Sequence, residues 1–150
     1  ESRKRFFGAA VVFLFFRKFR QGGAAMCGAI LLSLLVGNLL LKNLVARDRP
    51  CWIDPDFLQL LVSVPKDFSF PSAHTMISVS AAAALFHYSK ALGIPALVIA
   101  ALVGFSRLYL FVHFPTDVLV GAVIGVLLAV VSCIVTDKIV ARIKSKKAVN

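Results

Sequence analysis

The sequence predicts an all-α protein, a bundle of helices that crosses a membrane several times. Hydrophobic residues make up 59% of its 150 residues, above the roughly 45–50% that is usual in soluble domains, and the mean hydropathy is +0.88. The apolar residues lie in long uncharged runs, and a membrane-spanning helix needs about 20 mainly apolar residues. Composition and patterning therefore predict a polytopic membrane helix bundle, built as one domain over residues 1–150.

Four uncharged runs are the candidate membrane helices, namely 24–41, 76–86, 94–105 and 118–135. A fifth candidate, 6–16, is shorter. It could be a truncated span, an interfacial helix, or a helix whose flanking basic side chains snorkel to the membrane surface. We therefore expect about five spans in this sequence.

The helix 24–41 contains glycine and serine residues that let neighbouring helices pack closely in lipid. Ser72 can cap the next helix, with His74 in its first turn, where unpaired backbone N–H groups favour an anion. Pro95 fits the first turn of the following helix, and Pro115 fits the opening of the last one. The GAVIG segment at 121–125 predicts a packing face of small residues on that last helix.

The net charge of +10 indicates membrane orientation and not nucleic-acid binding. Basic residues cluster at 17–20 and 138–147, and alternating spans place both clusters on one side, which the positive-inside rule makes cytoplasmic. The loop 42–72 then lies outside, and its own charges nearly cancel. A nucleic-acid binder would need its basic residues on a solvated face with interleaved aromatic side chains, so we expect no nucleic-acid partner.

Three polar clusters fall at the outer ends of the predicted helices, at 42–50, 71–74 and 106–117. Charges in or near hydrocarbon are costly, so three such clusters at one depth indicate one functional site. Lys42, Arg49 and Arg107 offer a dense set of donors, and the arginines can present a fork that matches a phosphate group. The site therefore predicts a substrate that carries two or more negative charges.

Two histidines accompany these cations. His113 and Asp117 are four residues apart, so on a helical turn the carboxylate can hold the imidazole in one tautomer. An oriented imidazole is a nucleophile or a base. A lone histidine near a helix end is more often structural. That is our interpretation of His87, and it is the alternative for His74 and His113 when each is taken alone.

The spacing of these residues resembles the three-part signature of the type 2 phosphatidic acid phosphatase superfamily. The ten matching positions are Lys42, Arg49 and Pro50; Pro71, Ser72 and His74; and Ser106, Arg107, His113 and Asp117. The superfamily includes lipid phosphate phosphatases, bacterial undecaprenyl-pyrophosphate and phosphatidylglycerophosphate phosphatases, glucose-6-phosphatase and the vanadium haloperoxidases. Members of this kind commonly have six spans, which implies a first helix that precedes this sequence. The family's middle motif usually has glycine where Ala73 stands, and we expect activity to tolerate the change.

The resemblance implies a role for each matching residue. His113 would attack phosphorus to give a phosphohistidine, with Asp117 orienting it, and His74 would protonate the leaving oxygen and then activate water. The phosphate oxygens would be held by Lys42, Arg49, Ser72, Arg107 and the backbone N–H of Ala73. No metal or other cofactor is expected, because the sequence has no carboxylate cluster of the kind that holds Mg²⁺.

The expected function is metal-independent hydrolysis of a membrane lipid phosphate or lipid pyrophosphate, at the outer face of a bacterial plasma membrane, with the C-terminus in the cytoplasm. Undecaprenyl pyrophosphate is the favoured substrate, and phosphatidic acid and phosphatidylglycerophosphate stay open. The alternative is a non-hydrolytic protein that binds or flips a lipid phosphate, although such a protein needs no nucleophile with an orienting carboxylate. The haloperoxidases are soluble and larger, so composition disfavours that branch. The sequence does not determine the oligomeric state.

Overall fold

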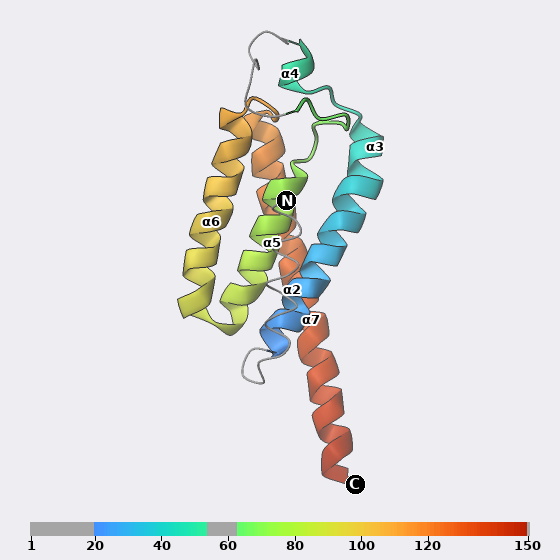
Figure 1. The fold of residues 1–150 in the computed structure, drawn as a ribbon. Coiled ribbons are helices and arrows are strands. Elements are labelled where there is room, and N and C mark those ends of the chain that lie inside the picture. Colours follow the sequence, from blue (N-terminus) through green and yellow to red (C-terminus); the bar gives the residue numbers. More distant parts are fainter. Residues whose placement is uncertain (1–19, 54–62, 150) are drawn as a thin grey trace.

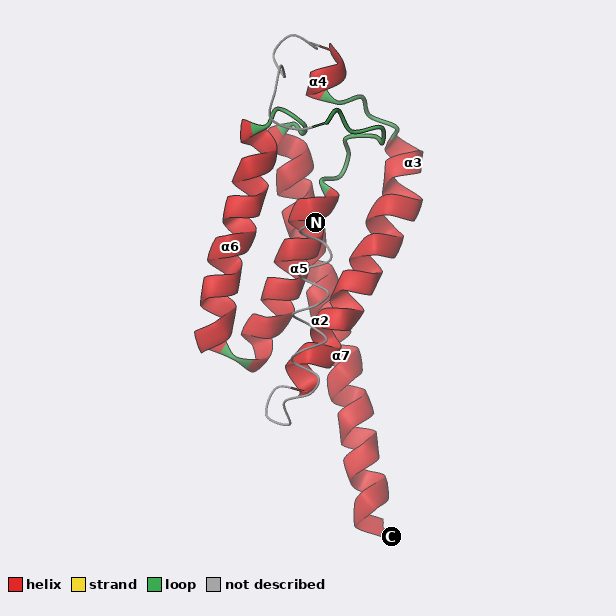
Figure 2. Ribbon diagram, in the orientation of Figure 1, coloured by secondary structure: helices red, strands yellow, loops and turns green. Residues whose placement is uncertain are grey.

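The computed structural model describes residues 20–53 and 63–149, and these ranges contain helices and loops but no strand (Figure 2). The predicted all-α class is therefore confirmed. The helices are α2 (Arg20–Ser33), η1 (Leu34–Leu41), α3 (Lys42–Val45), α4 (Pro50–Ile53), α5 (Ala73–Tyr88), α6 (Lys90–Tyr109) and α7 (Pro115–Val149). The fifth candidate span, 6–16, lies outside the described residues.

Helix α5 is the centre of the bundle, because it packs against α2, α6 and α7 (Figure 1). The elements α2, η1 and α3 follow one another without a break and form one long helix that widens to π geometry over η1. Helix α7 is the longest element and continues beyond the bundle toward the C-terminus (Figure 1). Each of the four predicted apolar runs falls within these helices.

Three stretches of the described chain are long and apolar enough to cross a membrane, namely Arg20–Ile53, Lys90–Tyr109 and Pro115–Lys147. The outward faces of these helices carry large apolar side chains, and Leu39, Phe105 and Leu119 are each about two-thirds exposed. A soluble monomer rarely exposes so much contiguous apolar surface, whereas lipid accommodates it. Helix α5 is shorter, with 16 residues, and its neighbours bury most of it.

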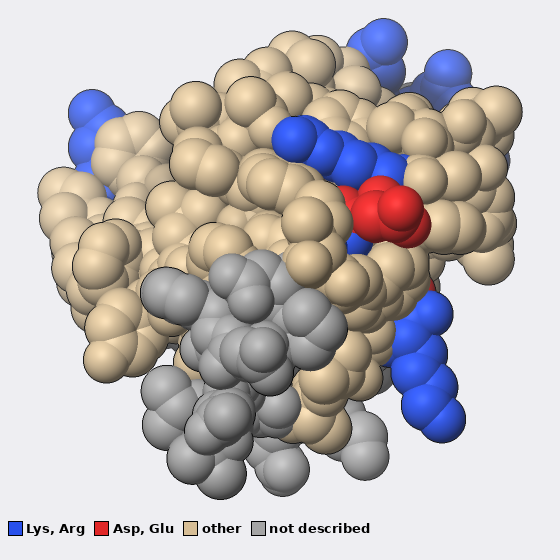
Figure 3. Space-filling model, turned by 90° about the horizontal axis from the view of Figure 1, so that it is seen from above, with Lys and Arg blue, Asp and Glu red and all other residues tan. Residues whose placement is uncertain are grey.

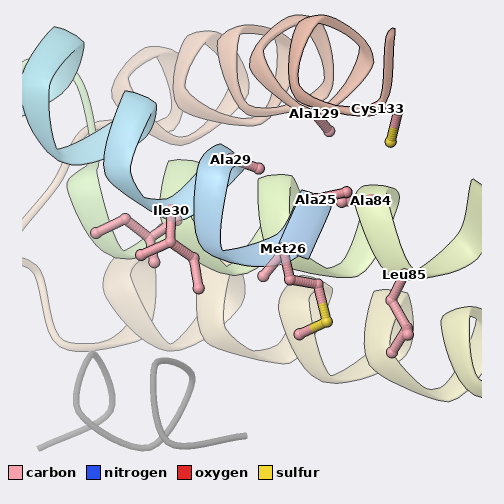
Figure 4. Close-up of a cluster of buried hydrophobic side chains, with 10 residues drawn as sticks. Ala25, Met26, Ala29, Ile30, Ala84, Leu85, Ala129 and Cys133 are labelled. Carbon is pink, nitrogen blue, oxygen red and sulfur yellow. The ribbon is translucent and has the colours of Figure 1, made fainter. Parts of the chain in front are cut away.

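Alanines and a few larger apolar side chains fill the core between α2, α5 and α7 (Figure 4). The buried cluster consists of Ala25, Met26, Ala29, Ile30, Ile77, Ala81, Ala84, Leu85, Ala129 and Cys133. Two hydroxyl contacts join the same helices. Ser33 Oγ donates to Ser80 Oγ at 2.9 Å, and Ser132 Oγ donates to the Ala25 carbonyl oxygen at 2.8 Å. Small residues and interhelical hydrogen bonds are what hold helices together in lipid, where the hydrophobic effect adds little.

The predicted packing face on the last helix is confirmed. A Cβ atom built on Gly125 would lie 2.7 Å from the Met76 carbonyl oxygen, and one built on Gly121 would lie 2.9 Å from the Ser72 carbonyl oxygen. Both contacts are with backbone atoms, so at these two glycines the backbone of α7 packs directly against the backbone at the start of α5. This approach brings the first turns of the two helices together at one end of the bundle.

Replacing Gly125 with valine should therefore destabilise the protein by about 1–3 kcal/mol, because the added carbons meet backbone that cannot rotate away. Gly22→Ala is the matched control, since its new Cβ would lie 3.5 Å from Tyr88 Cβ, an ordinary contact. Thermal unfolding in detergent measures both variants. Equal melting temperatures for Gly125→Val and wild type would contradict the close α5–α7 contact.

The start of α6 differs from the prediction. Helix α6 begins at Lys90, so Pro95 lies inside the helix and not in its first turn. The cause is the short turn that precedes it. Ser89 alone separates α5 from α6, and Gly93 packs against the backbone of Phe86 while its N–H donates to the Ser89 carbonyl oxygen at 2.8 Å. Helix α6 therefore begins five residues before Pro95.

Candidate active site

The ends of several helices and the loops between them meet at one end of the bundle (Figure 2). They enclose a cavity of about 420 Å³, lined by Lys42, Arg49, Ser63, Pro65, Asp67, Ala73, His74, Arg107, Val112 and His113. Six of the eight predicted site residues are among these. The other two, Ser72 and Asp117, are fully buried and do not line the cavity. Motifs that are far apart in the sequence thus converge as predicted.

His113 reaches the cavity through a tight turn after α6. Phe111 adopts a left-handed conformation with φ of 54°, which is unfavourable for a bulky residue. The turn is closed by the Val112 N–H, which donates to the Arg107 carbonyl oxygen at 3.3 Å. Backbone strain of this kind is typical of functional sites, where the surrounding structure enforces it. The result is that His113 is almost fully buried at the cavity wall.

Asp117 is held in the first turn of α7. Pro115 is the first residue of that helix, a position that suits proline because it lacks an N–H group. Asp117 Oδ2 accepts the Phe114 N–H at 2.9 Å, as the acidic residue of a capping box does. Arg47 Nη1 donates to Oδ1 at 2.9 Å, and Ser69 Oγ donates to Oδ2. These donors stabilise a carboxylate that is fully buried.

The imidazole of His113 faces this carboxylate. Its Nδ1 lies 3.6 Å from Asp117 Oδ2 and 3.5 Å from Ser69 Oγ. Both distances are longer than an ordinary hydrogen bond, as is common in the ligand-free state of an active site. The sequence led us to expect the two residues on one face of a helical turn. Instead, His113 precedes α7, and the two residues meet across the start of that helix.

Arg49 fixes the tautomer of the neutral His113 ring. Arg49 Nη1 lies 3.2 Å from His113 Nε2, and because a guanidinium only donates, Nε2 must accept and Nδ1 must carry the proton. Burial and the positive charges of Arg49 and Lys42 lower the pKa of the His113 imidazole to about 3, and Asp117 opposes the shift only in part. The ring is therefore neutral at pH 7, with the Nε2 lone pair available to an electrophile that displaces the arginine contact.

Arg49 also connects the two loops of the site. Its Nη1 donates to the Val112 carbonyl oxygen at 2.8 Å, and its Nε donates to the Asp67 carbonyl oxygen at 2.6 Å. Its Nη2 forms an ion pair with Asp67 Oδ1 at 2.8 Å, and Lys42 Nζ pairs with Asp67 Oδ2. Burial raises the pKa of the Asp67 carboxyl, but the hydrogen bonds and charges of Lys42 and Arg49 outweigh it and leave that pKa below its usual value.

The start of α5 differs in detail from the prediction. Ser72 is the residue that precedes the helix, but its hydroxyl contacts Thr75 Oγ1 at 2.9 Å and makes no side-chain cap, while its N–H donates to the Asp117 carbonyl oxygen at 3.1 Å. The hydroxyl of Ser72 is therefore turned to its own helix. Ala73 opens α5 and is not among the described residues with positive φ, so alanine fits where the family usually has glycine.

Arg107 and His87 lie at opposite ends of the bundle. Arg107 is half-buried at the cavity, and its Nε and Nη2 donate to Ser106 Oγ at 3.2 and 3.1 Å. His87 lies at the opposite end of the bundle, where its Nε2 is 3.3 Å from Asp137 Oδ2. That contact agrees with the structural interpretation of His87.

Arg47, Asp67 and Ser69 have side chains that bind predicted site residues, and the sequence analysis did not assign them to the site. Arg47 also stacks on Phe114, with its guanidinium carbon 4.0 Å from the ring centroid. Seen from the loop end, acidic and basic side chains lie next to one another (Figure 3). The near cancellation of charge in the loop 42–72 was the available sequence signal for these pairs. Among the described residues, no group of three or more His, Cys, Asp or Glu could hold a metal ion.

A bundle of membrane-spanning helices with this cavity defines an integral membrane protein whose cavity gathers three cations and two histidines. The chain belongs to the PAP2 superfamily, whose family profile it matches over residues 22–140. The predicted family is thus confirmed. The membrane location rests on the three stretches that are long and apolar enough to cross a membrane.

Individual relatives agree with this assignment. The chain is 32% identical over 114 residues to the undecaprenyl-diphosphatase of Sulfolobus acidocaldarius, which covers 75% of this chain and 54% of that protein. It is similar to the crystal structure of Aquifex aeolicus LpxE, with a TM-score of 0.72 and 31% identity over 84% of this chain and 74% of that one. A PAP2 type phosphatidylglycerolphosphate phosphatase from Bacillus subtilis gives a TM-score of 0.65 and 35% identity, over 87% of this chain and 66% of that one. The chain spans about half the length of the curated relatives it matches.

Proposed function

We propose that this chain is a single membrane-embedded phosphatase domain that hydrolyses a lipid phosphate or lipid pyrophosphate without a metal ion, through a phosphohistidine intermediate. The observation that carries the proposal is the cavity in which His113 and His74 lie among Lys42, Arg49 and Arg107. A cluster of cations suits a group with several anionic oxygens. Two histidines in one such cavity suit nucleophilic attack followed by proton transfer.

The first chemical step transfers the phosphoryl group to the enzyme. His113 Nε2 attacks phosphorus, a P–N bond forms, and the P–O bond to the lipid breaks as His74 gives its proton to the leaving oxygen. The phosphorylated ring is an imidazolium whose Nδ1–H faces Asp117 and Ser69, so the buried carboxylate stabilises the charge that develops. Lys42, Arg49, Arg107 and the first N–H groups of α5 hold the phosphate oxygens.

The second step returns the enzyme to its starting state. A water molecule attacks phosphorus on the side that the lipid has left, and His74 takes its proton. The P–N bond breaks, inorganic phosphate leaves, and His113 is again neutral. We assign Ser72 a supporting role at the start of α5 and no contact with phosphate, because its hydroxyl contacts Thr75.

The distribution of charge supports an orientation for the protein. Basic side chains crowd the end of α7 that is remote from the cavity, at Lys138, Arg142, Lys144, Lys146 and Lys147. The positive-inside rule makes that end cytoplasmic. We therefore place the cavity on the extracytoplasmic side of a bacterial plasma membrane. Among substrates we favour undecaprenyl pyrophosphate, because a relative named undecaprenyl-diphosphatase matches three-quarters of this chain.

The test is phosphate release by the purified protein in detergent with EDTA present. The substrates are undecaprenyl pyrophosphate, phosphatidic acid and phosphatidylglycerophosphate, each assayed with and without the chelator. Release that survives chelation supports the metal-independent mechanism, and the relative rates rank the three lipids. Activity that disappears with EDTA and returns with Mg²⁺ would reject the mechanism.

A further inference from the structure

The carboxylate of Asp67 forms ion pairs with Lys42 and Arg49, two of the cations that the proposed mechanism assigns to the substrate. One of its oxygens pairs with Arg49 Nη2 at 2.8 Å, and the other pairs with Lys42 Nζ. A single anionic group thus holds two cations through two oxygens, which is the arrangement expected of a phosphate in the same place. The low pKa of Asp67 means that the group is charged at neutral pH.

The two cations are buried, whereas the carboxylate is exposed. The side chains of Lys42 and Arg49 are 7% and 4% exposed, whereas that of Asp67 is 58% exposed. The backbone around Asp67 is anchored separately, because Arg49 Nε donates to its carbonyl oxygen and the Ser69 N–H donates to the Arg47 carbonyl oxygen at 2.8 Å. Rotation of the Asp67 side chain alone would therefore release both cations without moving the loop.

A second cavity gives the released carboxylate a polar destination. It has a volume of about 310 Å³ and is lined by Asn38, Lys42, Asn43, Lys66, Asp67 and Phe68. Lys42 and Asp67 line both cavities, so their ion pair forms part of the wall between them. Asn38, Asn43 and Lys66 line this cavity, and side chains of these types can donate N–H groups to the carboxylate once it leaves Arg49.

We propose that Asp67 is a specificity-determining residue that selects anions by charge, an inference that rests on the proposed function of this site. A phosphate monoester or pyrophosphate carries roughly two or more negative charges. It can therefore displace the singly charged Asp67 carboxylate from Lys42 and Arg49. A phosphodiester, the form of the ordinary membrane phospholipids, brings only one charge and gains nothing by the exchange. Ordinary membrane phospholipids would thereby be excluded from the site.

Binding to the purified full chain tests this inference without turnover. The probes are inorganic phosphate at about pH 8, where it is mainly a dianion, and dimethyl phosphate, a monoanionic diester, each measured by isothermal titration calorimetry. The variants are Asp67→Asn and Asp67→Ala, and Asp48→Asn is the matched control because it removes an exposed acid from the same loop. Thermal unfolding confirms that each variant is folded.

Wild type and Asp48→Asn should bind phosphate and give no measurable dimethyl phosphate binding. Both Asp67 variants should bind phosphate about three- to tenfold more tightly, since the ion pairs they remove are partly solvent-screened, and they should also bind the diester. Phosphate binding that is unchanged or weaker in the folded Asp67 variants would overturn the proposal and make Asp67 a scaffold for the two cations.

The same data separate this inference from the proposed function. If wild type selects phosphate over the diester, the Asp67 variants lose the selection, and no lipid phosphate is hydrolysed, then the phosphatase proposal fails and the charge selection stands. If wild type hydrolyses a lipid phosphate and the Asp67 variants bind anions like Asp48→Asn, then the charge selection fails and the phosphatase proposal stands.

Discussion

Replacing His113 with alanine should lower the turnover of the phosphatase by about 10⁴-fold or more, because the variant lacks the imidazole that forms the P–N bond in the proposed mechanism. Binding of inorganic phosphate should be nearly unchanged. Lys42 and Arg107 are untouched by the substitution, and Arg49 keeps its bonds to the Val112 and Asp67 carbonyl oxygens. The measurements are phosphate release in detergent and phosphate binding by calorimetry.

His113→Gln is the second variant, because it fills more of the space of the buried ring and separates loss of chemistry from loss of folding. His87→Ala is the matched control. It removes an exposed histidine from the far end of the bundle, and its turnover should equal that of wild type. Wild-type turnover in His113→Ala would show that the nucleophile is another group. Loss of phosphate binding in a folded His113→Ala would move the histidine from the chemistry to the binding of substrate.

Local patterns in the sequence predicted the helices and their packing well. Uncharged apolar runs leave few alternatives to a membrane helix, and glycines four residues apart, such as Gly121 and Gly125, predicted the face that meets α5. The convergence of Lys42, His74 and His113 followed from the same patterns. When spans alternate, polar segments at every second turn must return to the same side of the membrane.

The supporting contacts of the site could not be predicted in this way. Arg47 and Asp117 are 70 positions apart and meet because the loop after α3 packs against the start of α7. Asp67 and Ser69 lie in a loop without hydrophobic periodicity, so no pattern indicated which way their side chains would face. Counting the charges of that loop showed that they nearly cancel, but counting cannot show that Asp67 pairs with two of the predicted phosphate ligands.

The helix starts show the same limit. Ser72 was predicted at the correct position before α5, but its hydroxyl turned to Thr75 and not to a backbone N–H. Pro95 was expected at a helix start and lies inside α6, because Gly93 lets that helix begin against Phe86. In the first case a hydroxyl contact within α5 replaces the cap, and in the second the packing of Gly93 against Phe86 sets where α6 begins.

Asp117→Asn should lower kcat by about 10²- to 10⁴-fold with little change in KM, because Asp117 acts on the nucleophile and does not line the cavity. An asparagine side chain is nearly the same size, but it has no charge to stabilise the phosphorylated imidazolium of His113. It can also turn an N–H toward Nδ1 and favour the wrong tautomer. The kcat and KM values for phosphate release from the best substrate of the panel measure this separation.

The matched control for Asp117→Asn is Asp137→Asn, which removes a carboxylate paired with His87 from the far end of the same helix. That variant should keep wild-type kcat. Asp117→Asn should also lose about 1–3 kcal/mol of stability, because Arg47, Ser69 and the Phe114 N–H all donate to the buried carboxylate. A folded Asp117→Asn protein whose kcat falls less than about tenfold would reduce Asp117 to a helix-capping residue. A loss of kcat at constant KM distinguishes orientation of the nucleophile from support of the fold. A residue that only supports the fold changes the stability of the protein and leaves kcat of the folded enzyme unchanged.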